Sequence, residues 1–152
     1  MKKTFKETKF YNVIFPVWFL LIFPQVWLVV LPGNFIIDSI VLIISMFALK
    51  IAEKKEFYKK HILGIFLFGM LSDIIAAVFL LFMVGYFELG RLGDEWYLTV
   101  PALLIAAGLI FVLNYFFTFG KSDKALRLKL SLIFAIVTAP YTFMIPTSWI
   151  YY

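Results

Sequence analysis

The chain has 152 residues, of which 64% are hydrophobic, 20% aromatic and only 15% charged, and its net charge is +5 at pH 7. This composition excludes a soluble monomer, because an average soluble domain is roughly 45–50% apolar and about 25% charged and needs polar side chains to cover its surface. The sequence contains no cysteine, which excludes a disulfide framework, a thiolate metal site and a cysteine nucleophile. These properties are typical of an integral membrane protein.

Five apolar stretches are candidates for membrane spans, each of which needs about 20 mostly apolar residues. The first of them ends at Pro32-Gly33-Asn34, a sequence typical of a turn that reverses the chain. The second is short for a span. The predicted fold class is therefore all-α, a polytopic bundle of five transmembrane helices that forms a single membrane domain over residues 1–152. The predicted spans are residues 10–31, 35–50, 62–87, 96–119 and 128–150.

The basic residues are distributed unevenly around these stretches. Thirteen of the 14 Lys and Arg residues lie before the first stretch, between the second and third, or between the fourth and fifth. Because short cytoplasmic loops carry the excess of Lys and Arg, the N-terminus is predicted to be cytoplasmic and the C-terminus outside. We expect a multi-pass protein of a cell membrane, such as a bacterial plasma membrane, that attracts anionic lipid to its cytoplasmic face.

A cleaved signal peptide is the alternative interpretation of the first stretch. Its apolar run is longer than the roughly 7–15 residues of a signal core, and Pro-Gly-Asn-Phe is a poor match to a cleavage site. A membrane span is therefore the favoured interpretation.

Asp73 is the most informative residue. It lies 11 residues into the third stretch, roughly 16 Å from the cytoplasmic end and near the middle of a hydrocarbon layer about 30 Å thick. A carboxylate at this depth should face the bundle interior and either be protonated or bind a proton or cation. Gly69 and Ala77 share its helical face and favour close helix packing. A purely structural role, with a protonated Asp73 hydrogen-bonded across a tight helix contact, is equally open.

Other polar residues are expected at comparable depths in the outer half of the bundle. Asp38 lies one turn into the second stretch, where it and Asn34 could instead satisfy free N–H groups at a helix N-terminus. Pro24 precedes Gln25, and Pro140 precedes Tyr141 and Thr142. These prolines are expected to interrupt helices there. The predicted binding cluster consists of Gln25, Asp38, Asp73, Tyr141 and Thr142.

Three classes of function remain open. The first is a non-enzymatic subunit or accessory factor of a membrane complex or homo-oligomer, favoured by the lack of a soluble domain and by small-residue stripes on the third and fourth stretches. The second is a small proton- or cation-coupled transporter or channel that uses Asp73 with help from Asp38. An intramembrane enzyme is disfavoured, because acid–base chemistry needs convergent groups, and the expected depths of the two carboxylates differ by roughly 8–9 Å. We expect no cofactor, no metal site and no nucleic-acid partner.

Overall fold

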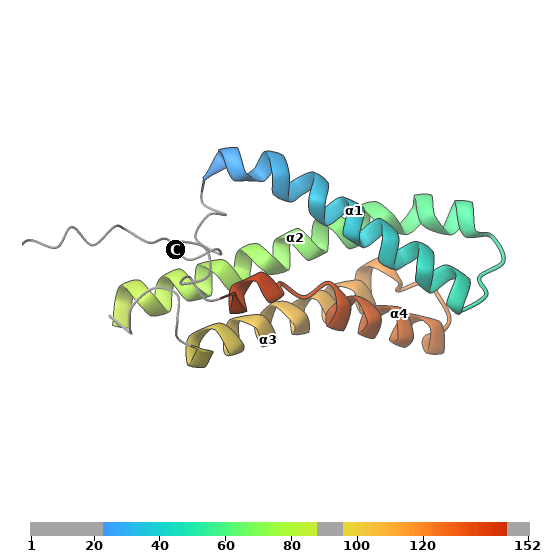
Figure 1. Ribbon diagram of the computed structural model, residues 1–152. Coiled ribbons are helices and arrows are strands. Elements are labelled where there is room, and N and C mark those ends of the chain that lie inside the picture. Colours follow the sequence, from blue (N-terminus) through green and yellow to red (C-terminus); the bar gives the residue numbers. More distant parts are fainter. Residues whose placement is uncertain (1–22, 88–95, 146–152) are drawn as a thin grey trace, which may run out of the picture.

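The computed structural model describes residues 23–87 and 96–145 of the chain, and within these ranges every regular element is a helix. A π-helical turn, η2, continues α3, and a short 3-10 turn, η3, follows α4. Figure 1 shows that the long helices alternate in direction, so that the α1–α2 and α3–α4 connections lie at the same end of the bundle. The elements are α1 (Pro24–Ala48), α2 (Lys54–Phe87), α3 (Trp96–Leu113), η2 (Asn114–Thr118), α4 (Lys124–Val137) and η3 (Tyr141–Met144).

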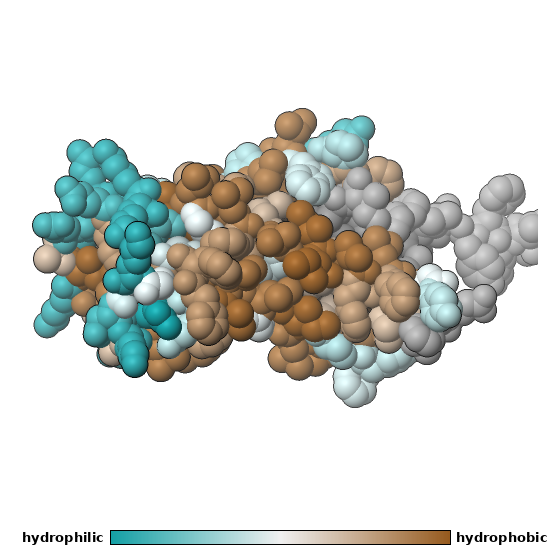
Figure 2. Space-filling model, turned by 180° about the vertical axis from the view of Figure 1, so that it is seen from behind, coloured by the Kyte–Doolittle hydropathy of each residue, from teal (hydrophilic) through white to brown (hydrophobic). Residues whose placement is uncertain are grey.

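Four segments of the described chain are long and apolar enough to cross a membrane. These are Pro24–Ala48, Lys54–Tyr86, Trp96–Thr118 and Lys124–Met144. Large hydrophobic side chains on all four point outward. In α1, only 17% of the most apolar 18-residue stretch is buried against the rest of the chain. Figure 2 shows these side chains as a broad apolar surface, with hydrophilic residues gathered at one end. An outward surface of this kind matches a lipid solvent and indicates a membrane protein.

The predicted chain reversal at Pro32-Gly33-Asn34 is wrong, because α1 runs through all three residues. Interrupting a helix in lipid leaves several backbone groups without partners, whereas Pro32 removes only one N–H donor. Residues 24–31 therefore belong to the same helix as residues 35–48, and α1 has 25 residues, which at 1.5 Å per residue is about 37 Å. The rest of the predicted first span, and the two chain termini, lie outside the described residues.

The later boundaries agree more closely with the sequence. The predicted span 96–119 corresponds to α3 continued by η2, and α2 contains the predicted span 62–87 but begins eight residues earlier, at Lys54. α4 begins at Lys124, where the Asp123 side chain accepts a hydrogen bond from the Ala125 N–H at 3.2 Å. It ends at Val137, while the candidate span continues to Met144, so the predicted span 128–150 is present as far as the described residues reach, with the interruption expected near Pro140. Pro140 cannot donate a helical hydrogen bond, which explains the break.

The buried core has two parts. The end of the bundle that holds the α1–α2 and α3–α4 connections is called the lysine-rich end, because Lys50, Lys54, Lys55, Lys121 and Lys124 lie there. At this end, all four helices contribute to one cluster, which includes Leu42, Ile65, Ile110 and Phe134. At the other end, the cluster contains residues of α2, α3 and η3 but none of α1. In Figure 1 the N-terminal half of α1 diverges from the other helices. This divergence positions the pocket described next.

Candidate functional site

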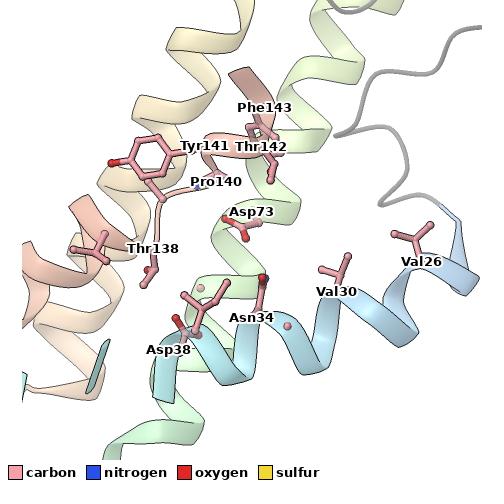
Figure 3. Close-up of a pocket in the computed structure, with 15 residues that line it drawn as sticks. Val26, Val30, Asn34, Asp38, Asp73, Thr138, Pro140, Tyr141, Thr142 and Phe143 are labelled. Atoms are coloured by element: carbon pink, nitrogen blue, oxygen red, sulfur yellow. The ribbon is translucent and has the colours of Figure 1, made fainter. Parts of the chain in front are cut away.

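A pocket of about 400 Å³ lies between the N-terminal half of α1, the middle of α2 and the segment that follows α4 (Figure 3). α2 contributes Gly69 and Asp73, and residues 137–143 form the third wall. The α1 residues recur at helical spacing and therefore share one face of that helix. They are Val26, Val30, Gly33, Asn34, Ile37 and Asp38.

Asp38 is the most deeply buried charged residue in the pocket wall, with 5% of its surface exposed. Its side chain reaches across to α2, since a Cβ atom added to Gly69 would lie 3.8 Å from Asp38 Oδ2. Gly69 is one helical turn before Asp73. Asp38 is the fifteenth of the 25 residues of α1, so its predicted place near a helix N-terminus is wrong. The offset in depth expected between the two carboxyl groups assumed that helix start and no longer holds.

The two carboxyl groups share the pocket without a compensating charge. Asp73 Oδ1 is buried and has no hydrogen-bond partner among the described residues. Asp38 Oδ2 approaches α2 one helical turn from Asp73, both residues line the pocket, and none of the described lining residues is basic. Two neighbouring carboxylates in apolar surroundings cannot both stay ionised unless a positive charge joins them. The pocket therefore favours a proton or a cation.

The break after α4 leaves main-chain carbonyls without helical hydrogen bonds in residues that line the pocket. The Tyr141 N–H donates to the Ala139 carbonyl at 2.7 Å instead of to Val137, its helical acceptor. Within the described chain, no hydrogen bond ends on the carbonyls of Val137 or Thr138, and both residues line the pocket. These groups also lie at the negative end of the α4 dipole.

The structure brings together four of the five residues of the predicted cluster. Asp38, Asp73, Tyr141 and Thr142 line the pocket, whereas Gln25 is not among its described lining residues and is exposed at the start of α1. The Tyr141 hydroxyl does not face the carboxyl groups, because it donates a hydrogen bond to the Ile136 carbonyl (Figure 3). That these residues bind a ligand stays a prediction.

The predicted cluster did not include two polar residues that also line the pocket. The Asn34 side-chain amide donates to Met70 Sδ at 3.2 Å, and Thr138 Oγ1 donates to the Phe134 carbonyl at 2.8 Å. Asn34 precedes Asp38 by one helical turn, a spacing that the sequence shows, but the helix start expected there favoured a capping role for Asn34 over a place in the pocket. Since both side chains already have partners, Asp38 and Asp73 remain the principal groups open to a ligand.

The described residues contain no group of three or more His, Cys, Asp or Glu side chains that could hold a metal ion. Comparison of the chain with protein families, with characterised proteins and with solved structures finds no match. The function is therefore inferred from the arrangement of the chain's own residues.

Proposed function

We propose that the four described helices cross the membrane with the lysine-rich end of the bundle in the cytoplasm. Support comes from the two connections at that end, which together with the adjoining helix turns carry nine Lys and Arg residues and form the hydrophilic end in Figure 2. Cytoplasmic loops carry such an excess, and each basic side chain near the surface attracts anionic lipid by about 1 kcal/mol. This orientation places the carboxylate pocket on the outer side of the four-helix core.

Because the native chain has no cysteine, single cysteines test this orientation cleanly. A membrane-impermeant maleimide applied to intact cells should label Gly85→Cys, near the outer end of α2, and should label Lys121→Cys only after the cells are opened. The reverse pattern would contradict the proposed orientation.

We propose further that the protein is a small transporter for protons or cations and that Asp38 and Asp73 form its binding site. The observation that carries this proposal is the pairing of two carboxyl groups in one pocket that has no described basic residue. Ionisable groups inside a membrane bundle mark ion and proton pathways. The exposed apolar helix faces, which a subunit or homo-oligomer would also use, are accounted for by lipid and do not favour a protein partner.

Transport by alternating exposure fits the bundle better than an open channel does. Below the pocket, the four-helix cluster with Leu42, Ile65, Ile110 and Phe134 at its centre separates the carboxyl groups from the lysine-rich end. Asp73 lies 19 residues beyond Lys54, which is about 28 Å along α2. A bound ion can therefore reach the cytoplasm only if the helices around this cluster move. The broken helix at residues 138–140 resembles the discontinuous helices that line transporter sites.

Purified protein in liposomes tests the proposal. With an inside-negative membrane potential, proton or cation entry should be measurable for wild type and should fall to the empty-liposome rate for Asp38→Asn or Asp73→Asn. Asp123→Asn is the matched control, because it changes an acid outside the pocket and Asn caps helices about as well as Asp. Equal rates for all four proteins would overturn the proposed transport site.

A further inference from the structure

Building on the transport function proposed above, we infer that the cation held between Asp38 and Asp73 is a primary ammonium group that carries an apolar body. The geometry of the pocket supports this assignment through its size, its polar groups and its apolar walls.

The size of the pocket is that of a small-molecule site. Its volume of about 400 Å³ falls within the range of about 300–1,000 Å³ for ligand pockets, whereas a water molecule takes only about 30 Å³. Ca²⁺ and Mg²⁺ take about six or more oxygen ligands. Most of the wall is instead apolar, formed by side chains such as Val26, Val30, Ile37, Val137, Pro140 and Phe143.

The polar groups of the pocket are arranged to accept hydrogen bonds. Ionised Asp38 and Asp73 are acceptors only, and the carbonyls of Val137 and Thr138 receive no hydrogen bond within the described chain. The hydroxyls of Thr138 and Tyr141 and one N–H of Asn34 already bond to Phe134, Ile136 and Met70. The second N–H of Asn34 and the Thr142 hydroxyl are the other side-chain donors in the wall, and both are uncharged. An ammonium group supplies three N–H donors together with the positive charge that the two carboxylates require. An anion would find no positive charge among the described lining residues.

The apolar side chains show where the body of the ligand would lie. Figure 3 shows Asp38, Asn34, Val30 and Val26 in order along α1, from the carboxyl groups toward the start of the helix. Asp38 and Val26 are 12 residues apart on α1, about 18 Å at helical rise. An ammonium group at Asp38 and Asp73 therefore leaves the part of the pocket lined by Val26 and Val30 for the body attached to it, on the side away from the four-helix core.

Gly33 offers a way to fill this space without disturbing the fold. It lines the pocket, and a Cβ atom added to it would have no atom within 4 Å. A leucine at this position should therefore occupy room that the ligand would use. Gly108 of α3 is the matched control, because it is also helical with nothing within 4 Å of an added Cβ atom, but it does not line the pocket.

The test is isothermal titration of the protein in phosphatidylcholine nanodiscs, whose lipid carries no primary ammonium. The probes are 2-phenylethylammonium, its uncharged counterpart 2-phenylethanol, and methylammonium, which lacks the apolar body. Wild type should bind 2-phenylethylammonium about tenfold or more tightly than either analogue, because each analogue loses either the charge-assisted hydrogen bonds or the apolar contact. Absence of binding, or equal affinity for 2-phenylethanol, would overturn the inference.

Variants locate the binding in this pocket. Asp73→Asn and Gly33→Leu should each weaken 2-phenylethylammonium binding by about tenfold or more, since one removes the charge and the other fills the space. Asp123→Asn and Gly108→Leu should bind like wild type, and unchanged affinity in both pocket variants would overturn the inference. If phosphatidylethanolamine in the nanodisc competes with the probe, the ammonium chemistry stands and the source is a lipid headgroup.

The proposed transport function fails separately from this inference. Ion entry that depends on Asp73, combined with no binding of the ammonium probe, would leave the transport proposal standing and remove the assignment of the ligand. Binding of the probe without any ion entry in liposomes would leave the assignment of the ligand standing and remove the transport proposal.

Discussion

The Tyr141 hydroxyl donates a hydrogen bond to the main-chain carbonyl of Ile136, which in a continuous helix would be the acceptor for residue 140. Residue 140 is proline and has no N–H to donate. The side chain of the next residue thus replaces the missing backbone donor, and the break after α4 is a defined structure with its own hydrogen bonds. Val137 and Thr138, which line the pocket, lie directly before this break.

Tyr141→Phe should destabilise the protein by about 1 kcal/mol, because it leaves the Ile136 carbonyl without its donor. Thermal unfolding in detergent measures the effect. Tyr115→Phe is the control, since none of the described hydrogen bonds involves the Tyr115 hydroxyl, and its ring still packs under Arg127 at 3.8 Å. If both variants unfold at the same temperature, the Tyr141 hydroxyl does not stabilise the break.

Gly120→Ala should be among the more damaging single substitutions in the described chain. A Cβ atom on Gly120 would clash with the main-chain carbonyl oxygen of Phe116 in the π-helical turn. Forcing an atom into such a contact costs about 1–3 kcal/mol. At Gly108 the same change meets no atom within 4 Å, and it should stabilise α3 by up to about 1 kcal/mol because alanine favours helix. Equal unfolding temperatures for the two alanine variants would contradict the close approach at Gly120.

Replacement of Asp73 separates a packing role from a ligand-binding role. Because Asp73 Oδ1 has no hydrogen-bond partner in the described structure, Asp73→Asn and Asp73→Leu should both be at least as stable as wild type. The leucine variant should gain up to about 1–3 kcal/mol, since it removes a buried polar group that lacks a partner. A leucine variant that unfolds at a clearly lower temperature would show that Asp73 holds the helices together, and would favour the structural interpretation of this residue.

The sequence was sufficient to predict the membrane class and the position of α3. The length of an apolar run between charged residues is enough to identify a membrane-spanning helix and its approximate ends. Pro32-Gly33-Asn34 misled the prediction, because these residues are typical of turns where water can satisfy the backbone. In lipid the helix continues, since opening it would leave more backbone groups without partners than Pro32 alone does. The same length argument explains why α1 continues, because residues 35–50 alone are short for a span.

For the candidate site, the expected depths placed four of the five predicted residues in one pocket although the depth of Asp38 was wrong, and depth does not say which way a side chain faces. Asp38 faces the same pocket as Asp73 because it belongs to one stripe along α1, formed by Val26, Val30, Asn34 and Asp38. Gln25 lies one residue before that stripe, and a step of one residue turns a side chain by about 100° around the helix. The direction of the Tyr141 hydroxyl depends on the path of the chain after Pro140, which the residue pattern does not encode.

A double-mutant comparison of ion entry into liposomes tests most directly whether Asp38 and Asp73 act as one site. Wild type, Asp38→Asn, Asp73→Asn and the double variant are measured under the same membrane potential, after equal incorporation into the lipid has been verified. Groups that act as a unit are strongly non-additive, so each single variant should lose nearly all the flux and the double variant should lose no more. Substantial flux in either single variant, or two partial losses that multiply in the double variant, would contradict a shared carboxylate site.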